Sequence, residues 1–227
     1  VKEYHYFYNK HLMSQSLPRF DCLWLTGITS SPETPTTDDL GPRLHLYSWL
    51  GTRYIVTPDS VDLPLPLKYQ ARIKIYENPD AFPRAYLVFR TELAADFKRA
   101  QAMTADTAVD LRQVAFVETD DLLLNGKPGN GKAIITAYHS GKITITAWTD
   151  QPALLVLTDN FYPGWECLVN GKQTAIARVN GLVRGVLLQP GSHTVVFRYI
   201  PMPFTAGLVL AGLALLIYGL LTITRVF

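Results

Sequence analysis

The second half of the chain is built from short, apolar-rich segments that alternate with tight-turn sequences. Seven segments have the length of a β-strand: KAIITAY, KITITAW, ALLVLTD, WECLV, QTAIARV, LVRGVLL and HTVVFRY. Two of the separators contain Asn-Gly, at 170–171 and 180–181, and this pair best adopts the positive dihedral angles of a two-residue hairpin turn. Many short strands joined by tight turns predict an antiparallel β-sandwich or jelly-roll-like domain, here at residues 128–201.

Two of these segments also predict how their strands are buried. In KITITAW, Ile143, Ile145 and Ala147 would face one side of a sheet, and Thr144, Thr146 and Trp148 the other. ALLVLTD does not alternate, which predicts a central strand that is buried on both faces.

The first half of the chain mixes irregular, helical and strand-like segments. Residues 1–42 form an irregular segment that contains the polar loop TSSPETPTTDDLGP. Residues 43–127 predict a small α+β region with a short helix that ends at Trp49, and strands at 53–56, 71–76, 85–89 and in QVAFVE. TELAADFKRAQAM predicts a helix capped by Thr91, with Leu93, Phe97 and Ala100 on one face. The predicted fold class is therefore a mixed α+β half followed by an antiparallel β-sandwich.

The C-terminal stretch 204–224, FTAGLVLAGLALLIYGLLTIT, runs for 21 residues without a charge. This is the length that a helix needs to cross a bilayer, so we predict one C-terminal transmembrane helix. Arg225 follows directly and is compatible with a cytoplasmic C-terminus, which would place the main domain on the extracytoplasmic side of the membrane. Small residues at Gly207, Ala211 and Ala214 would let a neighbouring helix pack closely, and a lone lipid-exposed anchor is the equally weighted alternative.

Composition excludes several classes of function. The net charge of +2 is spread along the chain, which argues against a nucleic-acid partner. The five histidines lack zinc-site spacing, the 126–132 segment GKPGNGK lacks the features of a phosphate loop, and no serine lies in a nucleophile elbow. We predict no catalytic, cofactor-binding or metal-binding residues. Cys22 and Cys167 form no C-x-x-C pair, and whether they form a disulfide stays open.

Four residues are candidates for contact with a glycan or a partner protein: Trp148, Tyr162, Trp165 and Arg84. Tyr162 and Trp165 belong to FYPGWECLVNGK at 161–172, where aromatic rings beside a Pro-Gly turn either stack on a sugar or form a structural corner between strands. Arg84 lies between two proline-broken segments at the junction of the two halves. Its guanidinium would bind a carboxylate that joins the halves, or an anionic ligand.

The strings YENPDAFPRAYLV, FYPGWECLVNGK and VNGLVRGVLLQPGSHTVVFRYIP, followed at once by the apolar run, resemble the C-terminal end of YfhO-like bacterial membrane proteins. The resemblance covers residues 44–224 in order. It implies a polytopic, GT-C-type glycosyltransferase-like protein whose catalytic acidic residue and lipid-linked donor site lie in membrane helices outside this chain. The sequence has Asn170-Gly171 where many relatives have Asp-Gly, and both pairs suit the same turn.

Two functions follow as hypotheses. In the first, the chain is the non-catalytic outward domain and membrane anchor of a glycosyltransferase-like polytopic protein, stabilising the membrane part or positioning a glycan acceptor. In the second, it is a single-span accessory subunit of a larger membrane complex, for example an energy-transducing one. Both imply the lipid bilayer and other transmembrane helices as partners. The chain begins at Val1 without a signal peptide, so an outward domain implies an export signal or earlier membrane helices upstream.

Overall fold

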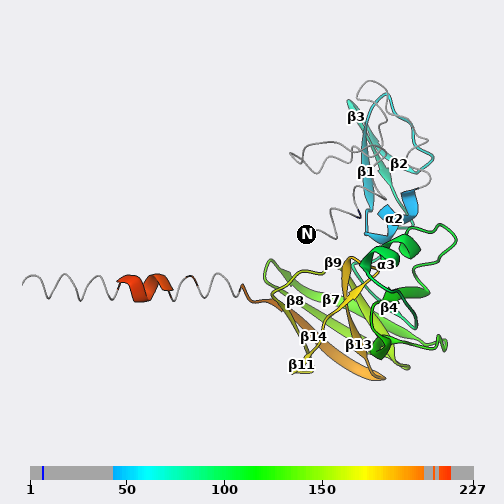
Figure 1. The fold of residues 1–227 in the computed structure, drawn as a ribbon. Coiled ribbons are helices and arrows are strands. Elements are labelled where there is room, and N and C mark those ends of the chain that lie inside the picture. Colours follow the sequence, from blue (N-terminus) through cyan, green and yellow to red (C-terminus); the bar gives the residue numbers. More distant parts are fainter. Residues whose placement is uncertain (1–6, 8–42, 202–206, 208–209, 216–227) are drawn as a thin grey trace, which may run out of the picture.

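The computed structural model describes Phe7, residues 43–201, Gly207 and residues 210–215, and these residues are mostly β-structure with few helices (Figure 1). The strands form three sheets of three, five and six strands. The β-rich part of the predicted fold class is thereby confirmed.

The six-stranded sheet contains strands from both halves of the chain. Its order is β4 (Ala85–Val88), β9 (Ala153–Asn160), β13 (Val183–Leu188), β12 (Ala177–Val179), β6 (Val114–Val117) and β5 (Arg90–Leu93). All neighbours pair antiparallel except β5 and β6, which are parallel. Residues 43–127 and 128–201 thus share one sheet.

The five-stranded sheet packs against the six-stranded one to form a β-sandwich. Its order is β11 (Lys172–Thr174), β10 (Trp165–Val169), β14 (Gly191–Tyr199), β8 (Lys142–Thr149) and β7 (Gly131–His139). Ile143, Ile145 and Ala147 of β8 are buried between the sheets, whereas Trp148 is 48% exposed on the outer face, as the alternation in KITITAW predicts.

Strand β9 is buried on both faces, which confirms the prediction from its unbroken apolar run. Leu155 and Leu157 join the core between the two large sheets. Leu154 and Val156 join a second core on the opposite face of the six-stranded sheet. A strand with a core on each side needs apolar residues at every position, and this is why ALLVLTD does not alternate.

The second core is covered by the rest of residues 43–127, namely helices α2 (Leu44–Trp49) and α3 (Phe97–Thr104), the 3-10 helix η5 (Asp120–Leu122), and the sheet β1 (Tyr54–Pro58), β3 (Ile73–Glu77) and β2 (Leu67–Gln70). Trp49 is fully buried in this core, and its indole donates a hydrogen bond of 3.0 Å to the hydroxyl of Tyr86 in the strand β4. The outer face of the three-stranded sheet exposes large apolar side chains, including Tyr54, Val56, Tyr69 and Ile73.

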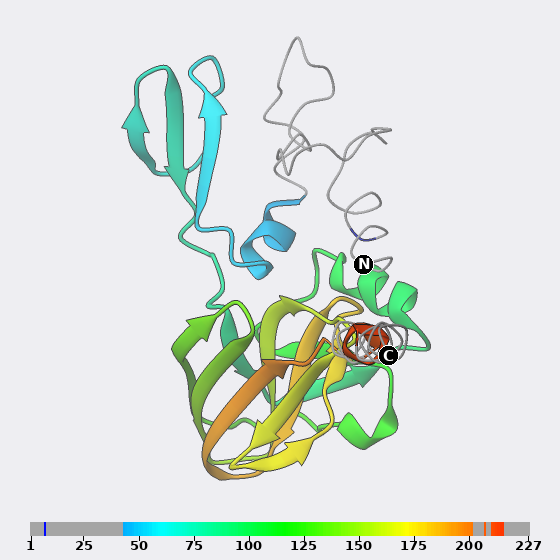
Figure 2. The same ribbon diagram turned by 90° about the vertical axis from the view of Figure 1, so that its left-hand side faces the viewer.

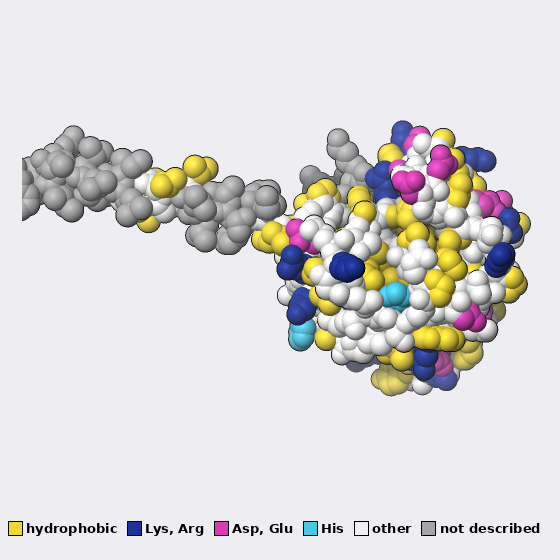
Figure 3. All heavy atoms as spheres, turned by 90° about the horizontal axis from the view of Figure 1, so that it is seen from below, with side chains coloured by type: hydrophobic (Ala, Val, Ile, Leu, Met, Phe, Trp, Pro, Cys, Tyr) yellow, Lys and Arg dark blue, Asp and Glu magenta, His cyan; other side chains and the backbone are white. Residues whose placement is uncertain are grey.

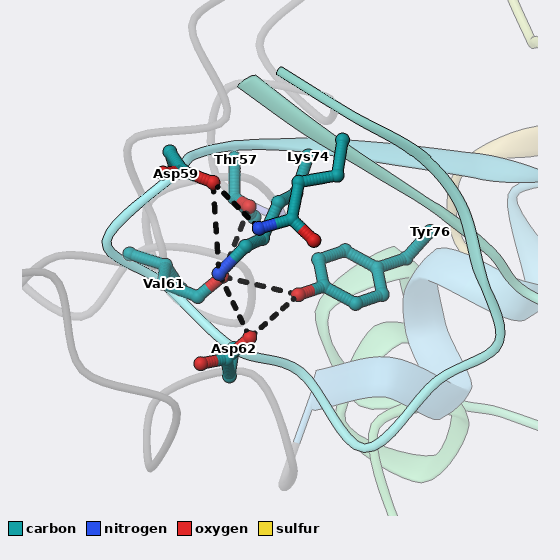
Figure 4. Close-up of polar contacts among 7 residues, drawn as sticks. Thr57, Asp59, Val61, Asp62, Lys74 and Tyr76 are labelled. Atoms are coloured by element: carbon teal, nitrogen blue, oxygen red, sulfur yellow. Dashed lines mark hydrogen bonds and ion pairs between the residues drawn. The ribbon is translucent and has the colours of Figure 1, made fainter. Parts of the chain in front are cut away.

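A buried lysine holds the loop that follows β1. Lys74 Nζ lies 2.9 Å from Asp62 Oδ1 and 3.9 Å from Asp59 Oδ1, while Tyr76 donates to the carbonyl of Val61 at 3.2 Å (Figure 4). The hydrogen bond from Lys74 lowers the pKa of Asp62, and the same contact raises the pKa of Lys74. The loop is thereby joined to the three-stranded sheet at several points.

Both predicted Asn-Gly turns are present. Asn170 and Gly171 have φ of 52° and 81° and form the two-residue loop between β10 and β11. Asn180 and Gly181 have φ of 53° and 67° and are the central residues of a turn in which Leu182 N donates to Val179 O at 3.0 Å, within a three-residue loop between β12 and β13. At Gly181 an added Cβ would lie 2.3 Å from the carbonyl oxygen of Phe97, so glycine also allows the turn to approach α3.

Two local predictions were wrong. Helix α3 begins at Phe97 with Asp96 as its N-cap, whose carboxylate accepts from Arg99 N at 2.8 Å. Thr91 lies in β5 instead, where its hydroxyl donates to Leu122 O and accepts from Leu124 N. The segment QTAIARV is divided between β11 and β12, which belong to different sheets because the chain crosses from one to the other at 175–176.

Most of the predicted membrane helix at 204–224 lies outside the described residues, which include only Gly207 and 210–215 of it. Residues 210–215 are helical, and Leu210, Leu213 and Leu215 are exposed. Within the portion of the chain that the structure describes, no helix is long and apolar enough to cross a membrane.

Candidate functional site

The chain leaves the β-sandwich at the end of β14, and two neighbouring loops hold it there (Figure 1). Tyr199 N donates to the carbonyl of Gly141 at 2.9 Å, in the turn between β7 and β8. Ile200 N donates to the carbonyl of Gly164 at 2.7 Å, in the turn before β10. Gly164 has φ of 97°, and a Cβ there would lie 2.8 Å from the ring of Tyr199, so only glycine allows this approach.

Aromatic side chains gather at this end of the sandwich. The ring of Tyr199 lies 5.5 Å from that of Trp165 and 6.4 Å from that of Tyr162, measured between centroids. Tyr162 is 43% exposed, whereas Trp165 is partly buried against the sandwich core. Tyr162 therefore presents a free aromatic surface, and Trp165 contributes to the fold.

Beside the aromatic residues lies a charged cluster that joins the two large sheets. Asp159 of β9 forms ion pairs with Arg84 and, at 2.8 Å, with Arg184 of β13. Arg84 also donates to the hydroxyl of Tyr138 at 2.8 Å. A β-bulge between Ile135 and Ala137 shifts the register of β7, so that Tyr138 pairs with the inward-facing Ile143 and reaches this cluster.

Arg184 is the least exposed member of the cluster, with 2% of its side chain accessible. Its guanidinium carbon lies 3.9 Å from the centroid of the Trp165 ring. Nε and Nη1 are buried and have no hydrogen-bond partner among the described residues. Burial lowers the pKa of Arg184, and the charge of Asp159 opposes that effect. The cation is thus stabilised mainly by one carboxylate and one indole ring.

A pocket of about 230 Å³ opens next to the aromatic residues. Its lining combines aromatic and polar side chains: Phe161, Tyr162, Trp165, Glu166, Gln173 and Thr174. Aromatic rings with a few hydrogen-bonding groups are what a small sugar-like ligand requires.

The structure brings only some of the predicted contact residues together. Tyr162 and Trp165 are neighbours, and Arg84 lies by the adjoining cluster, bound to a carboxylate as one of its two predicted roles requires. Trp148 lies at the other end of the five-stranded sheet, because it pairs with Ser192 while Trp165 pairs with Tyr199. Seven residues along β14 separate the two pairs by about 23 Å. Gly207, Ala211 and Ala214 are exposed.

Asp159, Tyr138 and Arg184 were not predicted from the sequence as site residues. A signal was present for Arg184, because a charge inside the apolar segment LVRGVLL must be either at an edge or paired in the core. The bulge that turns Tyr138 inward has no comparable sequence signal.

Cys167 is a further buried group next to the pocket, and burial raises the pKa of its thiol to about 12. On the order of one thiol in ten thousand is then ionised at pH 8, and the thiolate is the reactive form. In a Cys22→Ser chain we expect iodoacetamide at pH 8 to modify Cys167 at least about 100-fold more slowly in the folded than in the urea-unfolded protein. Mass spectrometry over time measures both rates, and equal rates would contradict the burial of this thiol. Cys22 lies outside the described residues.

In comparison with known proteins, the family model of the bacterial membrane protein YfhO matches residues 102–211. The match begins within α3, includes all of the five-stranded sheet, and continues past Tyr199 to Ala211, which lies in the helical residues 210–215. No curated protein and no solved structure matches the chain significantly. The resemblance predicted from the sequence is confirmed by the family match.

Proposed function

We propose that this chain, whose residues 102–211 match the family model of the bacterial membrane protein YfhO, is a non-catalytic, outward-facing β-domain with a membrane anchor. The anchor is the apolar segment 204–224, with the C-terminus in the cytoplasm. The domain stabilises the membrane part of a glycosyltransferase-like polytopic protein. Its parent protein, and not this chain, carries the catalytic residues.

The observation that carries this proposal is the continuity between the sandwich and the apolar segment. The family match runs without a break from the five-stranded sheet to Ala211. Leu210, Leu213 and Leu215 are 66%, 51% and 72% exposed, and exposed leucines on one short helix need an apolar environment or a partner. A bilayer supplies that environment to every face of the helix.

A second role at the same end is the positioning of a glycan acceptor. The pocket beside Tyr162 and Trp165 favours it, since its aromatic and amide side chains suit a sugar ring. The contacts of the other candidates within the domain favour the stabilising role, because Arg84 is bound to Asp159 and Trp165 is stacked on Arg184. A single-span accessory subunit remains the alternative in which the same anchor and domain contact neighbouring subunits.

Flotation tests the anchor directly. We expect the full chain, reconstituted with phospholipid vesicles, to rise with them in a sucrose gradient. Two charges in the described helix, Leu210→Lys with Leu213→Lys, are expected to cost about 5–7 kcal/mol of insertion free energy and to leave most of the chain in the aqueous fractions.

The matched control adds the same two charges elsewhere. Thr146 and Thr194 are exposed residues of β8 and β14, and Thr146→Lys with Thr194→Lys is expected to leave flotation unchanged. Flotation of both double variants to the same degree would overturn the proposed anchor.

A further inference from the structure

We infer, on the basis of the proposed membrane anchor, that the end of the sandwich from which the chain leaves contacts the headgroups of an anionic lipid bilayer. The residues involved are Arg84, Lys142, Tyr162, Arg198 and Tyr199, here termed the exit surface. The inference goes beyond anchoring, because it assigns a lipid-contacting role to the folded domain itself.

Position along the chain is the first argument. Ile200 is held by Gly164, and only three residues, Pro-Met-Pro, lie between Ile200 and the start of the apolar segment at Phe204. Five residues from Tyr199 to Phe204 span at most about 18 Å when fully extended, and any bend shortens this. Figure 2, which faces this end, shows the 210–215 helix end-on in front of the sandwich and apart from the three-stranded sheet. The exit surface is therefore the part of the domain nearest to an inserted segment.

Residue chemistry is the second argument. Tyr and Trp are enriched at membrane interfaces, where the ring lies among the upper acyl chains and the polar atom reaches water. Tyr162 is 43% exposed and packs on Tyr199, which in turn packs on Trp165. Tyr199 is placed on the exit side by its own backbone bond to Gly141, and Tyr162 lies two residues before Gly164, which binds Ile200.

Charge is the third argument. Arg84, Lys142, Arg184 and Arg198 supply four positive charges at this end, whereas Asp159 and Glu166, which pair with three of them, supply two negative ones, leaving an excess of two positive charges. Lys142 is exposed at the start of β8, directly after Gly141, whose carbonyl accepts from Tyr199 N. Figure 3 shows Lys and Arg side chains beside Asp or Glu at the end from which the chain leaves, with further Lys and Arg side chains elsewhere on this face. Each Lys or Arg close to an anionic surface contributes about 1 kcal/mol to binding.

The test places one fluorescent label on either end of the sandwich. The full chain with Cys22→Ser retains Cys167, which is buried. Tyr162→Cys or Trp148→Cys then adds one reactive cysteine, and the two native side chains are 43% and 48% exposed, so the sites are matched in accessibility. Each labelled chain is reconstituted into phosphatidylglycerol-containing vesicles that carry a nitroxide-headgroup lipid as quencher.

We expect the label at 162 to be quenched at least about threefold more strongly than the label at 148, given a separation of about 23 Å along β14. Lys142→Glu in the Tyr162→Cys chain is expected to reduce this quenching in phosphatidylglycerol vesicles and to have little effect in phosphatidylcholine vesicles. Equal quenching at 162 and 148 in chains that still float overturns the inference and leaves the anchor intact. Chains that fail to float overturn both.

Discussion

Asp159→Ala is expected to lower the free energy of unfolding by about 3–5 kcal/mol, because it leaves the cation of Arg184 buried without a counter-ion. Arg184 is 2% exposed and Asp159 11% exposed, so water cannot replace the lost carboxylate at low cost. Two of the guanidinium nitrogens already lack partners among the described residues, which makes the remaining ion pair the main compensation. Urea denaturation of the full chain in detergent measures the effect.

Two further variants distinguish the effect of leaving a buried cation unpaired from the effect of losing a carboxylate at the surface. Glu166 pairs with Arg198 at 2.9 Å, but their side chains are 32% and 49% exposed, so Glu166→Gln is expected to cost less than about 1 kcal/mol. Arg184→Met added to Asp159→Ala removes the unpaired cation and is expected to recover part of the lost stability. If Asp159→Ala and Glu166→Gln cost the same, the carboxylate of Asp159 does not stabilise a buried charge.

Trp49→Ala is expected to lower the free energy of unfolding by about 3–5 kcal/mol and to weaken the whole described domain, not only helix α2. Trp49 is fully buried, and it shares one apolar core with Leu154 of β9 and Val183 of β13. Its hydrogen bond to Tyr86 joins α2 directly to the six-stranded sheet. The expected result is a lower midpoint in a single transition that circular dichroism and tyrosine fluorescence report alike.

Trp148→Ala is the matched control for this variant, because it removes the same side chain from an exposed position. We expect it to change stability by no more than about 0.5 kcal/mol. Two separate transitions in Trp49→Ala, with the sandwich unchanged, would show that the core on this face does not join the two halves into one cooperative unit.

The parts of the fold that sequence predicted are those determined by local chemistry. The Asn-Gly pairs at 170–171 and 180–181 adopt positive φ angles readily, so the two turns follow from the local sequence. The unbroken apolar run of β9 reflects a core on each face of the strand. Contacts between distant segments were not predictable in this way. The pairing of β4 with β9, and of β6 with β12, depends on apolar surface that residues far apart in sequence bury together.

Helix α3 and the charged cluster show two different reasons why prediction from the sequence was incomplete. Thr91 and Asp96 are both suitable N-caps, and only the bonds of Thr91 to the 122–124 segment decide that it belongs to a strand. For the cluster, the sequence predicted that Arg84 would bind a carboxylate or an anion, but Asp159 could not be identified as its partner. That pairing depends on the register between β4 and β9.

The two backbone hydrogen bonds at Tyr199 and Ile200 also determine how freely the domain can turn. Beyond Ile200 only Pro201, Met202 and Pro203 precede the apolar segment, and each proline ring restricts one backbone dihedral. Such a connection has few rotatable bonds with which to absorb a change of direction. In the proposed membrane-anchored arrangement, a tilt or rotation of the anchor would therefore be transmitted to the sandwich as a change in its orientation.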